Sequence, residues 1–199
     1  LEVIDGKEEA ELNLKGAIEH VLEKSEYVIV YDLGGASTEV TLAKNSKNPE
    51  IISTVSIPWG ARNSSEAFDL VEYNEGRANK LRAEVDKSLE VFFAKAGNIA
   101  EKNVSFVATS STPLRLVSMI RQFGCYDREK ADGLIMSKAE MDEAIAKLLS
   151  AKRTELAKNP YIGDKRSYIF ISAAVIFKQI YDRLGVDKIT ASLKSAKDG

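Results

Sequence analysis

Two runs of β-forming residues flank a glycine turn, and this pattern constrains the fold more than any other feature of the chain. Residues 27–31 read YVIVY and residues 37–43 read STEVTLA, both rich in β-branched or aromatic side chains. Asp32-Leu33-Gly34-Gly35-Ala36 joins them, and IISTVSI (51–57) follows after a polar turn. The three runs predict an antiparallel meander whose first turn is built from glycines.

Helical patterns alternate with strand patterns after the meander. An apolar stripe predicts a long helix over about 77–97, and VSFVA (104–108) predicts a short buried strand. Thr112 followed by Pro113 is typical of a helix start. Ser137-Lys-Ala-Glu140 has the sequence of a capping box, which predicts a further helix.

The last part of the chain predicts a buried helix and a final strand. Residues 167–184 are apolar nearly all round, Gly185 is a stop signal, and KITAS (188–192) reads as a strand. We therefore expect an α/β fold with a mixed sheet, in which an antiparallel meander precedes alternating helices and strands, and with a helical insert over about 124–165. This is the ribonuclease-H-like order on which actin-like ATPases are built, and we expect one domain over 1–199.

Composition argues against several functional classes. Of the 199 residues 44% are hydrophobic, the net charge is −2, and basic residues are scattered among acidic ones, so we expect no nucleic-acid partner. The chain contains no apolar run of membrane-spanning length. Cys125, the single cysteine, excludes an internal disulfide and fits a cytoplasmic protein. With one cysteine and one histidine, His20, a metal ion would be a hard cation bound by oxygen ligands.

The glycine turn has the residues of a phosphate site. Gly34 and Gly35 leave the backbone N–H groups uncovered, and successive exposed amides form a cradle for anions. Asp32 and Glu39 flank the turn, and two carboxylates beside a phosphate suit Mg²⁺. The alternative interpretation is an ordinary hairpin turn with solvated acidic flanks.

The segment VIVYDLGGASTEVTLA resembles the phosphate loop of the Ppx/GppA phosphatases, which is a strand followed by Asp-(Ile/Leu)-Gly-Gly-Gly-Ser-Thr-Glu. Seven of those eight positions agree, with Ala36 in the third glycine position. Further segments resemble the family's motifs in the same order: LEVIDGKEEAEL (1–12), SIPWGA (56–61), VATSSTPLRLVSM (107–119), KRSYIFISAAVI (165–176) and ITASLKSAKDG (189–199).

The resemblance implies a role for each matched residue. Glu9 would activate the attacking water, and Asp32 and Glu39 would hold Mg²⁺ or its water shell. The phosphate contacts would come from two loops: Gly34, Gly35, Ala36 and Ser37 in the first, and Thr109, Ser110, Ser111 and Thr112 in the second. The substrate would be polyphosphate or guanosine pentaphosphate. An N-terminal domain of the same protein would complete the site, so we expect this chain alone to be inactive, and a homodimer is a further expectation.

Departures from the family pattern fall on the functional loops. Ser110 and Ser111 stand where the family has two glycines, and side chains there restrict the backbone. Glu11 replaces an arginine, Asp5 a serine, Tyr168 an aspartate and Ala173 a glycine. These changes leave open a sensor of the same fold that binds polyphosphate or a nucleotide without hydrolysing it. A third hypothesis is that the chain is half of a sugar kinase or of a heat-shock-type ATPase.

Overall fold

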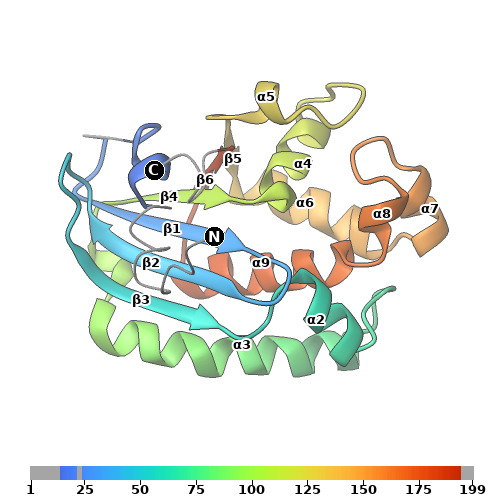
Figure 1. The fold of residues 1–199 in the computed structure, drawn as a ribbon, viewed down its shortest axis with the longest axis horizontal. Helices are drawn as coiled ribbons and strands as arrows, with labels where there is room; N and C mark the ends of the chain where they lie inside the picture. Colours follow the sequence, from blue (N-terminus) through green and yellow to red (C-terminus); the bar gives the residue numbers. More distant parts are fainter. Residues whose placement is uncertain (1–13, 22–23, 194–199) are drawn as a thin grey trace, which may run out of the picture.

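A six-stranded mixed sheet forms the centre of the protein, with the strand order β3-β2-β1-β4-β6-β5 (Figure 1). The computed structural model describes residues 14–21 and 24–193. The strands are β1 (Tyr27–Leu33), β2 (Thr38–Lys44), β3 (Ile51–Ile57), β4 (Val104–Thr109), β5 (Ile135–Ser137) and β6 (Lys188–Ser192).

The predicted meander is confirmed. β2 runs antiparallel to both β1 and β3, with Asp32 opposite Glu39 near the glycine turn. β4 pairs in parallel with β1, and β6 pairs in parallel with β4. Parallel strands end at the same edge of a sheet, so the turn after β1 and the loop after β4 emerge side by side.

Helices cover the face of the sheet on which the larger core lies. They are α2 (Ala61–Ala67), α3 (Glu75–Ala96), α4 (Ser111–Ile120), α5 (Arg128–Ala131), α6 (Lys138–Leu149), α7 (Arg153–Lys158), α8 (Asp164–Ser167) and α9 (Phe170–Leu184). A short 3₁₀ turn, Ile99–Glu101, precedes β4.

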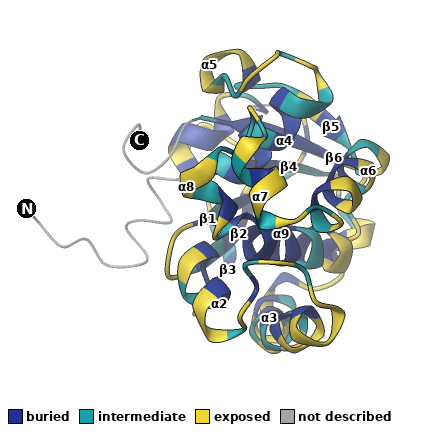
Figure 2. Cartoon of the chain, turned by 90° about the vertical axis from the view of Figure 1, so that its right-hand side faces the viewer, coloured by how far each residue is buried: buried dark blue, intermediate teal, exposed yellow. Residues whose placement is uncertain are grey.

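Helix α9 is the centre of that layer. Its residues are buried without interruption from Phe170 to Phe177, as the dark helix between the outer elements in Figure 2 shows. The ring of Phe177 contacts that of Tyr31 on β1, with centroids 5.2 Å apart. Gly185 ends the helix in the left-handed conformation, as predicted. The opposite face of the sheet packs against residues 14–21, through a smaller cluster that includes Leu14, Val28 and Val107.

Three expectations need correction. The segment about 124–165 is not wholly helical, because β5 lies within it and pairs antiparallel with β6. A three-residue strand has too little periodicity to be recognised, and its partner lies about fifty residues away. The helix expected over 167–184 is α9 and begins three residues later, at Phe170, after a break at which the Tyr168 carbonyl accepts from Ser65 Oγ (2.6 Å).

The helix expected to start at Thr112 begins earlier. Ser110 is the N-cap of α4, and Pro113 is the third helical residue rather than the first. Proline is tolerated throughout a first turn because the N–H groups there have no intrahelical acceptor. The sequence therefore located the first turn of the helix but not its first residue. The capping box is confirmed, since Ser137 and Glu140 cap α6 reciprocally.

Candidate functional site

The turn between β1 and β2 is fixed by its contacts with the start of α2. Gly34 N–H donates to the Ser37 carbonyl (2.9 Å), which closes the turn. The Gly34 carbonyl accepts from Ala61 N–H (2.9 Å), and the Gly35 carbonyl accepts from Arg62 N–H (2.9 Å). The carbonyl oxygens of this first loop therefore face α2.

The amides of the first loop point the other way. In a trans peptide the C=O and the following N–H point in opposite directions. With the carbonyls of Gly34, Gly35 and Ala36 directed at α2, the N–H groups of Gly35, Ala36 and Ser37 face away from it. Gly34, Gly35 and Ala36 are exposed. The loop therefore presents three successive amides on its open side, the arrangement that binds anions.

Gly60 makes this close approach of loop and helix possible. A Cβ at Gly60 would lie 2.5 Å from Ala36 N and 2.7 Å from the Gly34 carbonyl oxygen, distances that real side chains do not occupy. The Asn63 side chain completes the junction, because its Nδ2 donates to the Ala36 carbonyl (2.8 Å) while its Oδ1 accepts from Gly60 N–H (2.8 Å). The loop and α2 thus form one rigid unit.

The two predicted carboxylates lie on one face of the sheet. Asp32 and Glu39 are directly opposite each other in the β1–β2 ladder, and directly opposite residues project to the same side with neighbouring Cβ atoms. Ser56 of β3 continues the row, and its Oγ donates to Glu39 Oε1 (3.0 Å). Burial raises the pKa of Tyr31 well above its ordinary value, and the charges of Asp32 and Glu39 raise it further.

The second predicted loop follows β4 at the same edge of the sheet. Thr109 is fully buried, and its Oγ1 donates to the Tyr31 carbonyl (3.1 Å), which ties the loop to β1. Ser110 then turns the chain into α4 with φ 115° and ψ 166°. Ser111 and Thr112 form the first turn of α4.

A small cavity of about 10 Å³, room for roughly one water molecule, lies between the end of β1, the start of α2 and the first turn of α4. Leu33 and Ala61 border it beside the first loop, Ser111 and Thr112 border it from the second, and Arg166 reaches it from α8. The pairing of β1 with β2 and with β4, not the cavity, brings the eight predicted phosphate-loop residues and the two carboxylates to one end of the sheet. Glu9, the predicted base, lies outside the described residues.

The single histidine and the single cysteine do not form a metal or nucleophile site. His20 Nε2 pairs with Asp132 Oδ1 (2.9 Å), and Cys125 is exposed. Within the described ranges 14–21 and 24–193, no group of three or more His, Cys, Asp or Glu side chains is arranged to hold a metal ion. In the same ranges no helix has the length and apolarity to cross a bilayer.

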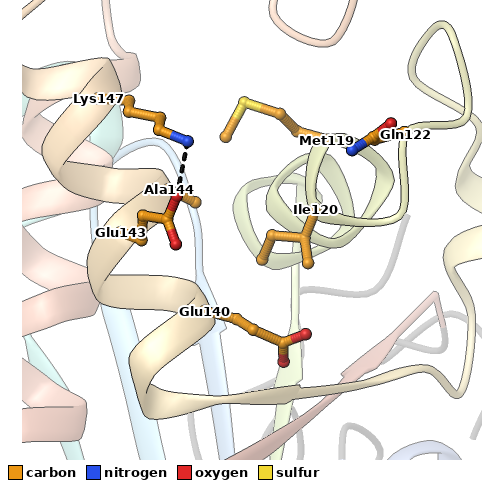
Figure 3. A pocket seen from close by; sticks show the side chains of 7 residues that line it. All are labelled: Met119, Ile120, Gln122, Glu140, Glu143, Ala144 and Lys147. Atoms are coloured by element: carbon orange, nitrogen blue, oxygen red, sulfur yellow. Dashed lines mark hydrogen bonds and ion pairs between the residues drawn. The ribbon is translucent and has the colours of Figure 1, made fainter.

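A larger groove lies at the far end of α4. It has a volume of about 320 Å³ and lies between α4 and α6, where Met119 and Ile120 face Ala144 (Figure 3). Glu143 and Lys147 pair with each other across one turn of α6 (2.7 Å) at its rim. It shares no lining residue with the two loops, so size alone does not identify the site.

Two features of the site had no assigned role in the sequence interpretation. Gly60 and Asn63 fasten the first loop, and Arg166 supplies a cation beside the second. A signal existed for Gly60, because SIPWGA matches a family segment, but only the fold shows that its missing Cβ admits the loop. Arg166 likewise lies in a matched segment, KRSYIFISAAVI, but only the fold places it beside Thr112, more than fifty residues away in the sequence.

The six-stranded mixed sheet and its helices have the fold of the actin-like class. The family model of the Ppx/GppA phosphatase family matches residues 1–199, and the chain belongs to that family. The predicted resemblance and the predicted α/β fold are thereby confirmed.

Solved structures show the same fold. An exopolyphosphatase from Cytophaga hutchinsonii superposes with a TM-score of 0.82 at 24% identity, covering 99% of this chain and 62% of that one. The Ppx/GppA phosphatase of Aquifex aeolicus superposes with a TM-score of 0.79 at 19% identity, covering 98% and 62%.

Curated relatives include two bacterial enzymes. The bifunctional 3-dehydroquinate synthase/phosphatase of Fusobacterium nucleatum is 27% identical over 95% of this chain and 28% of its own length. Exopolyphosphatase 2 of Mycobacterium tuberculosis is 23% identical over 100% of this chain and 62% of its own length. The chain thus spans less than two thirds of each relative.

Proposed function

We propose that the protein to which this chain belongs is a phosphoanhydride hydrolase that releases terminal phosphate from polyphosphate or guanosine pentaphosphate. The observation that carries the proposal is the first loop. Three amides face its open side, and two carboxylates lie in register directly beside them. Membership of a phosphatase family, with relatives named as exopolyphosphatases, supports the same reaction class.

Mg²⁺ is the proposed cofactor. Asp32 and Glu39 are hard oxygen donors on one face of the sheet, and Mg²⁺ is bound through one or two carboxylates together with substrate oxygens. In the part of the chain that the structure describes, they belong to no group of three or more His, Cys, Asp or Glu side chains that could hold a metal ion, and water and phosphate oxygens would complete the coordination. The ion would offset the negative charge of the phosphate chain and of the transition state.

Water attack on the terminal phosphorus needs a group that orients the water and accepts its proton. We assign this role to Glu9 on the family resemblance. The amides of the first loop and the first turn of α4 would receive the charge that develops on the phosphoryl oxygens. An N-terminal domain would contribute the opposing loop, and the chain alone would be inactive. A homodimer and a cytoplasmic location belong to the same proposal.

The second candidate function is a sensor that binds polyphosphate or a nucleotide without hydrolysing it. One observation favours it, namely that Ser110 replaces a family glycine and adopts a backbone conformation normal only for glycine. A loop under such strain binds its ligand in a geometry that need not support turnover.

Phosphate release from tripolyphosphate and guanosine pentaphosphate, measured with and without Mg²⁺ on the intact protein, separates the two candidates. Release that depends on Mg²⁺ supports the hydrolase, while tight binding without release supports the sensor. Glu9→Gln should lower the rate by about 10²–10⁴, because it removes a general base, and should change binding far less. Equal rates for the wild type and Glu9→Gln would show that the water is activated elsewhere.

A further inference from the structure

Arg115, a half-buried residue of α4, reaches across to the segment that leads into α8. Its Nη1 donates to two successive backbone carbonyls, those of Tyr161 (2.5 Å) and Ile162 (3.1 Å). Its guanidinium also stacks on the ring of Tyr126, with the guanidinium carbon 3.9 Å from the ring centroid. One side chain therefore joins α4 to two other segments of the chain.

This contact has an energetic cost. The Nε of Arg115 is buried and has no hydrogen-bond partner in the described part of the chain. Burial lowers the pKa of the Arg115 guanidinium, and the nearby charge of Arg166 lowers it further. An apolar side chain would pack at this position without such a cost, so packing alone does not account for an arginine here.

The segment that Arg115 holds also places Arg166. Gly163 begins α8 as its N-cap, at φ 75°, and its carbonyl accepts from Arg166 N–H (3.2 Å). Arg166 lines the small cavity together with Ser111 and Thr112, which belong to the first turn of α4. The contacts thus form a closed circuit, from α4 through Arg115 to α8 and back to the start of α4. Helices α7 and α8 lie at the end of the molecule that faces the viewer in Figure 2.

We propose that Arg115 is a positioning residue of the candidate site, which fixes the segment before α8 and so holds the Arg166 guanidinium beside the first turn of α4. The inference rests on the proposed function for the ligand that Arg166 would face. Arg115 acts through Arg166, because its own Nη1 already donates to two carbonyls. A bound anion would offset the repulsion between the two guanidiniums, so the ligand and Arg115 should stabilise the same arrangement.

Substitutions on α4 separate positioning from general packing. Arg115→Met removes the hydrogen bonds and keeps an unbranched apolar side chain, whereas Arg115→Lys keeps the charge but lacks the planar guanidinium. Arg121→Met is the matched control, because Arg121 lies at the C-terminal end of the same helix and donates to the Ile135 carbonyl (2.6 Å). Arg166→Met is made alone and together with each of the other two methionine variants, always in the intact protein.

Hydrogen exchange without ligand tests the contact itself. The amides of Ile162 and Gly163 both donate to the Asn159 carbonyl (3.1 and 2.9 Å), so their exchange reports opening of the segment. It should be about tenfold faster in Arg115→Met than in the wild type, because the segment loses two hydrogen bonds to a charged group. Arg121→Met should leave it unchanged. If Arg115→Met does not fold, Arg115→Lys provides the same test, with faster exchange expected at the same amides.

Affinity for tripolyphosphate with Mg²⁺ tests the consequence for the site. Arg166→Met should weaken binding about tenfold, and Arg115→Met should weaken it by a smaller factor of about three. Because Arg115 acts through Arg166, Arg115→Met should have almost no further effect in a protein that already carries Arg166→Met. Arg121→Met should leave the affinity unchanged in both backgrounds.

Unchanged exchange at Ile162 and Gly163 in Arg115→Met would overturn the proposed positioning. Additive losses of affinity from Arg115→Met and Arg166→Met would also overturn it, because the two residues would then act independently. A purely structural role would give faster exchange with unchanged affinity. A wild type that binds no tripolyphosphate would contradict the proposed function instead, and the exchange measurement would still decide whether Arg115 fixes the segment before α8.

Discussion

The loops that follow β1 and β4 both lie at one end of the sheet, but they differ in the contacts that stabilise them. The loop after β1 is locked by hydrogen bonds from α2, and Gly60 leaves it room. The loop after β4 turns through Ser110, which is strained and has a hydroxyl without a partner. The first loop is thus held in place by hydrogen bonds to α2, whereas the second contains a residue whose backbone conformation is unfavourable.

The contrast extends to charge. The first loop is flanked by Asp32 and Glu39. The second, Thr109 to Thr112, contains no charged residue, and Arg166 lines the small cavity that Ser111 and Thr112 border. Under the proposed function, the first loop would therefore bind a metal ion together with phosphate, and the second would bind phosphate oxygens alone. Substitutions in each loop should have correspondingly different effects.

The largest expected effect is on metal-dependent turnover. Asp32→Asn should lower Mg²⁺-dependent phosphate release by about 10²–10³, because a neutral amide no longer balances the charge of the ion. Thr112→Val in the second loop should lower it by only about tenfold, the effect of one hydrogen bond. Glu50→Gln, at the other end of the β2–β3 hairpin, is the control and should have wild-type activity. If Asp32→Asn and Thr112→Val lowered the rate of phosphate release equally, the two loops would not differ in their proposed roles.

Rigidity of the first loop is tested by Gly60→Ala. The added methyl would overlap the backbone at Gly34, Gly35 and Ala36, and we expect the free energy of unfolding to fall by about 2–3 kcal/mol. Gly35→Ala is the matched control within the loop, because a Cβ there meets nothing within 4 Å. Denaturant unfolding measures both variants. A Gly60→Ala protein as stable as Gly35→Ala would show that the loop can move away from α2.

The two loops should be alike in one respect, because a buried threonine hydroxyl beside each loop donates a hydrogen bond to a backbone carbonyl. Thr38 Oγ1 donates to the Trp59 carbonyl (2.7 Å) beside the first loop, and Thr109 Oγ1 donates to the Tyr31 carbonyl (3.1 Å) beside the second. Both threonines are fully buried. Replacement of either by valine should cost about 1–2 kcal/mol of unfolding free energy, because a buried carbonyl loses its donor. Thr154→Val on the exposed face of α7 should change stability by less than about 0.5 kcal/mol. If only one of the two threonine substitutions lowered the free energy of unfolding, the two hydrogen bonds would not be equivalent.

The smallest expected effect is on stability, at the start of α6. This helix has a capping box, whereas α4 has no side-chain cap. A hydrogen bond from Arg121, followed by those from Ser137, lowers the pKa of Glu140 from 4.5 to about 2. A lowered folded-state pKa gives stability that is present above the unfolded value of about 4.5 and is lost as the pH falls toward about 2. Because the Glu140 side chain is 37% exposed, Glu140→Gln should cost only about 0.5 kcal/mol at pH 7.

Unfolding measured from pH 7 down to pH 2 checks this sign. The stability difference between the wild type and Glu140→Gln should shrink below about pH 4.5 and should be mostly lost by about pH 2. Glu143→Gln is the control, since Glu143 is 70% exposed in a simple pair with Lys147. A difference that grows with acidity would mean that the carboxylate of Glu140 does not stabilise the cap.

The sequence by itself determined the elements whose pattern is local. β-branched runs and short turns specified the meander, a continuous apolar run specified the buried α9, and Ser137 with Glu140 specified the start of α6. The strand–glycine–strand motif also put Asp32 and Glu39 opposite each other, because a hairpin fixes its own register.

Only the tertiary structure decided the features that join distant segments. The pairing of β5 with β6, the break before α9, the clearance at Gly60 and the place of Arg166 each depend on residues far apart in the chain. Ser110 shows the reason most clearly. Its sequence context reads as an ordinary start of a helix, yet anchoring of Thr109 on one side and packing of α4 on the other impose a backbone that serine does not choose locally.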